Sequence, residues 1–86
     1  MTAAAISGNA LFHAVVESSG LASVFGPAVI ARALGRVGVK SHTMTRQDLT
    51  RALPAIEQAL LIYLPLAEVR THLAAIEQLA ATERAR

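Results

Sequence analysis

Three histidines, His13, His42 and His72, are the residues of this chain best suited to bind a metal ion or to transfer a proton. A helical metal site pairs two ligands four residues apart and adds further His, Cys or carboxylate ligands. No two of these histidines have that spacing, and the chain contains no cysteine. We therefore predict no metal site and no cofactor. His72 follows Glu68 by one helical turn, so we expect a local ion pair between them.

The chain also lacks the residues that nucleophilic and acid–base catalysis need. The serines at 18, 19, 23 and 41 are not in a glycine-flanked strand-to-helix turn, the setting that exposes a catalytic serine. The six acidic residues are scattered, whereas paired catalysis requires two acids in opposed environments. The stretch 35–38 is too short for a phosphate-binding loop and follows no strand. We expect no enzymatic activity.

Positive charge gathers in the middle of the chain. The net charge is +2, yet between residues 32 and 51 five basic residues face a single acid, Asp48. These basic residues are Arg32, Arg36, Lys40, Arg46 and Arg51. Arg32 and Arg36 are one helical turn apart and repel each other, which favours an anionic partner such as nucleic acid. A solvated helix face explains the same stripe, and both interpretations stay open.

Composition predicts the all-α class and one domain. The chain has 86 residues, of which 53% are hydrophobic and only three are aromatic. Alanine and leucine, with Glu, Gln and Arg, favour helices over strands. We expect a single helical domain over 1–86, with frayed ends at 1–7 and 82–86. No signal peptide is recognisable, and the apolar stretches 21–31 and 59–67 are too short to span a membrane, so a soluble cytoplasmic protein is expected.

Apolar spacing predicts the helices that position these side chains. Residues at steps of three or four form two rows, which are Leu49, Leu53, Ile56, Leu60 and Leu64, then Leu66, Val69, Leu73, Ile76 and Ala80. Pro65 separates the rows, so they form a C-terminal helical hairpin. Thr45 and Asp48 have capping-box spacing at the start of the third helix, and Pro54 is expected to kink it.

The first half of the chain predicts two shorter helices. Asn9 caps the first, which ends near Gly20. The second begins at the Gly26-Pro27 pair and ends at Gly38. Together with the hairpin, these helices predict a compact four-helix bundle.

Apolar residues outside the predicted seams indicate a contact surface. Leu61, Ile62 and Tyr63 extend the apolar surface of the third helix nearly around it. A helix that is apolar on most sides is either central in its bundle or at an interface. We therefore predict a protein–protein interaction module, acting as a homodimer or as a docking or regulatory domain. The predicted interface consists of Leu61, Ile62, Leu66 and Val69.

One short segment supports an alternative function. Residues 43–53, with the sequence TMTRQDLTRAL, resemble the last loop and helix of histone-fold proteins, where a Thr-apolar-Thr loop precedes a helix with Asp and then Ala-Leu. The resemblance covers eleven residues. It implies that Arg46 and the loop 40–43 would meet DNA phosphates. The long central helix of that fold is not predicted here, because Gly26 and Gly38 limit the second helix. Nucleic-acid binding is therefore the alternative to the interaction module.

Overall fold

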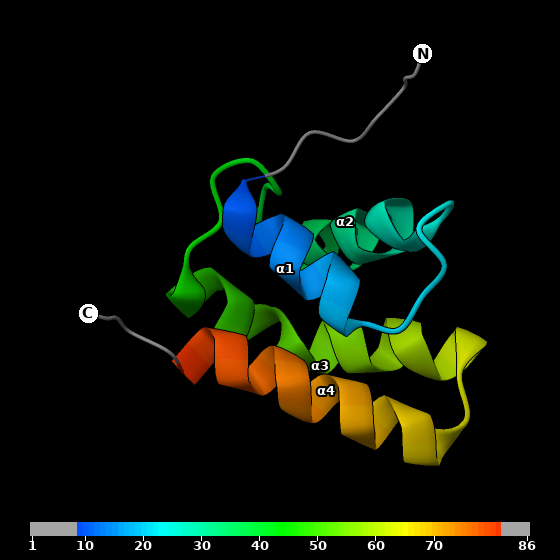
Figure 1. Ribbon diagram of the computed structural model, residues 1–86. Helices are drawn as coiled ribbons and strands as arrows, with labels where there is room; N and C mark the ends of the chain where they lie inside the picture. Colours follow the sequence, from blue (N-terminus) through cyan, green and yellow to red (C-terminus); the bar gives the residue numbers. More distant parts are fainter. Residues whose placement is uncertain (1–8, 82–86) are drawn as a thin grey trace.

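A computed structural model describes residues 9–81 of the chain (Figure 1). Four α-helices follow one another, α1 (Ala10–Ser18), α2 (Gly26–Arg36), α3 (Arg46–Tyr63) and α4 (Leu66–Ala81). None of the described residues is in a strand. The prediction of an all-α four-helix bundle is therefore confirmed. The predicted fraying of 1–7 and 82–86 lies outside the described residues.

Helix α1 begins and ends as its sequence predicts. The Asn9 side chain accepts a hydrogen bond from the Phe12 backbone N–H at 2.9 Å and so caps the helix. At the other end Gly20 has a φ of +77°, a left-handed conformation that favours glycine. Between helix and glycine, the buried Ser19 hydroxyl donates to the Val16 carbonyl at 2.6 Å. These contacts satisfy backbone groups that a helix end otherwise leaves unpaired.

Helix α2 begins at Gly26, with Pro27 in its first turn. Proline fits there because its missing N–H would have had no helical partner. The helix ends at Arg36, and Gly38, with a φ of +76°, turns the chain away. The loop that follows leads to α3, and its Met44 side chain is buried in the core.

Helices α3 and α4 form the predicted hairpin. Helix α3 continues through Pro54 without a break, and its apolar row keeps the same phase on both sides of the proline. A bend at Pro54 stays a prediction. Leu64 leaves the helix with extended backbone angles, and α4 starts directly after Pro65. The two helices run antiparallel and side by side (Figure 1).

The core lies between two pairs of helices. Helices α1 and α2 form one pair and α3 and α4 the other, with α1 packed on α4 and α2 packed on α3. The largest fully buried apolar side chains are Phe12, Ile30, Leu34, Leu49, Ile56, Leu60, Ile76, Val15 and Val69. Burying a side chain of this size stabilises the fold by about 1.5–3 kcal/mol relative to leaving it in water. No helix within residues 9–81 is long and apolar enough to cross a membrane.

Candidate functional site

Large apolar side chains are exposed at one end of the bundle. They come from the connector between α1 and α2 and from the corner between α3 and α4, which lie at the same end in Figure 1. We call them the end surface, and its members are Val24, Phe25, Leu61, Ile62, Tyr63 and Leu66. The Phe25 and Tyr63 rings join the two segments, with centroids 5.3 Å apart. Val24 is 92% exposed and Ile62 is 68% exposed, so neither contributes much to the core.

Of the four residues of the predicted interface, three are exposed and one is buried. Leu61, Ile62 and Leu66 are exposed, but Val69 is fully buried. Val69 lies seven residues before the buried Ile76, and this spacing returns to the same face of a helix. That face of α4 points into the bundle, so Val69 belongs to the core and not to the end surface.

The predicted interface omitted Tyr63, and it also missed the end-surface residues Val24 and Phe25. They lie in a short connector, where no helical period shows which side of the chain is buried. The available signal is their position next to the Gly26-Pro27 helix start. The connector is too short to bring both of these apolar side chains back to the core.

A hollow lies beside the end surface, in the groove between α2 and α3. Its lining residues are Val29, Arg32, Ala33, Arg36, Ala59, Ile62 and Tyr63. Ala33 and Ala59 are buried, and their small side chains leave room between the two helices. Arg32 and Arg36 are both exposed, and within residues 9–81 neither makes a hydrogen bond or an ion pair. The hollow therefore combines an apolar lining with two positive charges that have no partner among the described residues.

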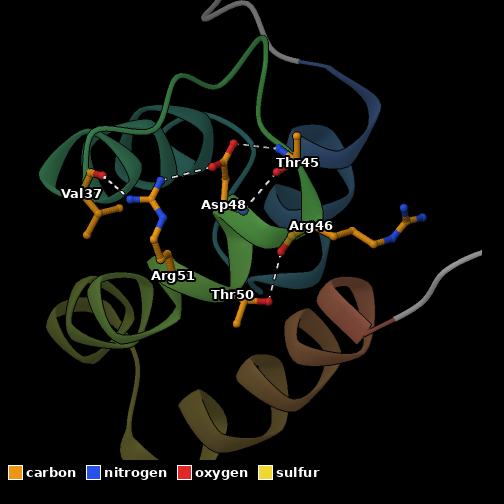
Figure 2. A network of polar contacts seen from close by, with 6 residues as sticks. All are labelled: Val37, Thr45, Arg46, Asp48, Thr50 and Arg51. Atoms are coloured by element: carbon orange, nitrogen blue, oxygen red, sulfur yellow. Dashed lines mark hydrogen bonds and ion pairs between the residues drawn. The ribbon is translucent and has the colours of Figure 1, made fainter.

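The structure divides the predicted basic stripe. Arg51 is engaged: one guanidinium nitrogen donates to the Val37 carbonyl at 3.3 Å and the other to Asp48 at 3.2 Å. Figure 2 shows the Arg46 side chain extending away from Arg51, on the opposite side of α3. Lys40 is exposed in the loop before α3. The stripe is thus not one continuous patch, and Arg32 with Arg36 is the pair that lines a hollow.

Asp48 is the centre of the polar network at the start of α3 (Figure 2). Its carboxylate accepts hydrogen bonds from the Thr45 backbone N–H at 3.1 Å and from Arg51. The Thr45 hydroxyl in turn accepts from the Asp48 backbone N–H at 3.1 Å, which completes the capping box. The Thr45 hydrogen bond, followed by that of Arg51, lowers the pKa of Asp48 below its ordinary value of 3.8. This network stabilises the start of α3.

The histidines lie far apart in the fold. His13 is on the exposed side of α1 against the Phe12 ring, His42 is in the exposed loop before α3, and His72 packs against Gly20. Within residues 9–81 no group of three His, Asp or Glu side chains could hold a metal ion. The expected ion pair between His72 and Glu68 is not formed, because the imidazole turns toward Gly20 at the end of α1.

Comparison of the chain with known protein families, with curated proteins and with solved structures finds no match. Function is therefore argued from the geometry of the end surface and of the hollow.

Proposed function

We propose that this chain is a non-catalytic protein–protein interaction module and that the end surface is where it contacts its partner. The observation that carries the proposal is the gathering of six exposed apolar side chains at one end of the bundle. Exposed apolar side chains gathered in this way, with the Phe25–Tyr63 ring contact joining the two segments, are typical of interaction sites in soluble proteins. Single exposed apolar residues scattered over the surface would carry no such meaning.

A second copy of the chain is the first partner to test. Homodimers are the commonest assemblies of soluble proteins, and a two-fold contact covers the same surface on both copies. Burying Ile62 and Val24 in such a contact recovers hydrophobic free energy that the isolated bundle does not use.

Sedimentation at several concentrations tests this proposal. We expect the apparent mass to rise with concentration and the Ile62→Lys variant to remain monomeric and folded. Gln58→Lys is the matched control, because Gln58 is exposed on the same helix and is not part of the end surface. A wild-type chain that stays monomeric at hundreds of micromolar contradicts self-association. The interaction module would then need a different partner.

Nucleic-acid binding remains the alternative, and Arg32 and Arg36 are the two basic residues that lie one turn apart on the same helix. Arg32 and Arg36 are unpaired within the described residues, whereas Arg51 is engaged and Arg46 lies on another side of α3. Two phosphate contacts give weak binding with a modest salt dependence, because the salt dependence scales with the number of phosphates that are neutralised. A salt-dependent mobility shift on mixed-sequence DNA, lost in the Arg32→Ala, Arg36→Ala double variant, would favour this alternative. The cytoplasmic location and the lack of enzymatic activity stay predictions from the sequence.

A further inference from the structure

The hollow between α2 and α3 has two properties that select a ligand. Its floor is apolar, formed by Ala33 and Ala59, and one wall is formed by Ile62. On the other wall, Arg32 and Arg36 follow each other by one turn of α2. An apolar side chain fits the floor, and two carboxylates one helical turn apart match the two guanidinium groups.

The two arginines are the stronger part of this observation. Like charges one turn apart on a helix repel each other, which offsets part of the favourable interaction of Arg36 with the C-terminal end of α2. Arg51 shows the contrast, because its guanidinium group has Asp48 and the Val37 carbonyl as partners. A negatively charged partner would relieve the repulsion between Arg32 and Arg36 and would form charge-assisted hydrogen bonds with them.

We propose that the hollow binds an acidic amphipathic segment of another protein, with an apolar side chain on the floor and carboxylates on Arg32 and Arg36. This site goes beyond the proposed self-association. A second copy offers little for it, because no two of the six acidic residues of this chain are three or four positions apart. A nucleic acid would pair with the arginines but would leave the apolar floor unused.

A peptide titration followed by nuclear magnetic resonance tests the proposal. The probe is a synthetic helical peptide of leucine and glutamate in amphipathic order, with blocked ends. The labelled protein carries Leu66→Lys, which disrupts the end surface without touching the lining of the hollow. We expect the amide signals of Ala33, Ala59 and Ile62 to move. Signals that move at other places on the bundle, or that do not move at all, would overturn the proposal.

Charge variants provide the controls. Binding should weaken by roughly tenfold or more in the Arg32→Gln, Arg36→Gln double variant, because each lost charge-assisted hydrogen bond is a strong one. Arg70→Gln, at an exposed arginine outside the hollow, should bind like the parent protein. A peptide with glutamine in place of glutamate should also bind at least roughly tenfold more weakly. Equal binding by the double variant, or displacement of the peptide by a DNA duplex that binds more tightly, would overturn the proposal.

The proposed homodimer and the proposed acidic partner can be refuted independently of each other. Peptide binding to the hollow in the Leu66→Lys protein does not depend on self-association. A monomeric wild-type chain with an occupied hollow would therefore contradict the homodimer and support the acidic partner.

Discussion

The two ends of α3 differ in how their side chains are used. At the N-terminal end, Thr45, Asp48 and Arg51 form a closed network that also includes the Val37 carbonyl (Figure 2). At the C-terminal end, Leu61 and Ile62 are exposed, and the neighbouring Arg32 and Arg36 have no ionic partner within residues 9–81. At one end of the helix the polar groups are paired within the chain, whereas at the other end apolar and charged side chains are exposed.

This difference separates residues that stabilise the fold from residues that we propose contact a partner. Groups satisfied within the chain, such as those of the capping box, contribute to the free energy of folding. Exposed apolar groups contribute little to it, because their surface stays in water in both the folded and the unfolded state. Substitutions at the two ends should therefore affect different measurements.

The largest expected effect comes from two adjacent leucines near the C-terminal end of α3. Leu60 is fully buried, and Leu60→Ala should lower the free energy of unfolding by about 2–5 kcal/mol. Leu61 is 39% exposed, so Leu61→Ala should cost much less. Denaturant titration of both variants provides the measurement. Equal losses would mean that Leu61 belongs to the core.

The second-largest expected loss of stability is at the N-terminal end of α3. Thr45→Ala removes the helix cap and should destabilise the protein by about 1 kcal/mol. Thr50→Ala is the control, since the Thr50 hydroxyl is exposed and donates only to the Arg46 carbonyl one turn earlier. That change should leave the midpoint of chemical unfolding nearly unmoved. If Thr45→Ala behaved like its control, the cap would not stabilise the fold.

Acid should weaken the same network. Hydrogen bonds from Thr45 and Arg51 lower the pKa of Asp48 in the folded state below its ordinary value of 3.8. The stabilisation from the ionised carboxylate is therefore complete above that value and is lost as the pH falls through the folded-state pKa. In thermal unfolding, the melting temperature of the wild-type protein should exceed that of Asp48→Asn at neutral pH, and this gap should close in acid. A gap that is independent of pH would contradict the role of the charge.

The smallest effect concerns the repulsion between Arg32 and Arg36. Arg32→Ala removes this repulsion from the middle of α2, and the free energy of unfolding should rise by about 0.2–0.5 kcal/mol. Arg51→Ala should have the opposite sign, because Arg51 has partners. Chemical unfolding at low salt compares the two. A loss of stability in Arg32→Ala would show that this arginine has a folding role.

Much of the fold follows from local chemistry in the sequence. Asn9, Thr45 and Asp48 act on backbone groups within one helical turn, and Gly20 and Gly38 take the positive φ that a helix end requires. Such interactions depend on neighbours along the chain, so spacing alone predicts them.

The candidate site is less predictable because it depends on how helices pack. Spacing places Leu61 and Ile62 outside the seams and both Leu66 and Val69 in one of them, but it does not show that Leu66 is exposed there while Val69 is buried. Nor does it show that Phe25 meets Tyr63, or that Arg46 points away from Arg51. These contacts and orientations involve residues from different elements, so no local rule in the sequence predicts them.

The most direct test of the contrast between the two ends is a dilution series of the wild-type protein followed by nuclear magnetic resonance. Amide signals are compared between hundreds and tens of micromolar. If the end surface is the contact surface, signals from residues 24–25 and 61–66 shift with concentration while those from residues 45–51 stay in place. Shifts concentrated at residues 45–51, or none anywhere, would contradict self-association through the end surface.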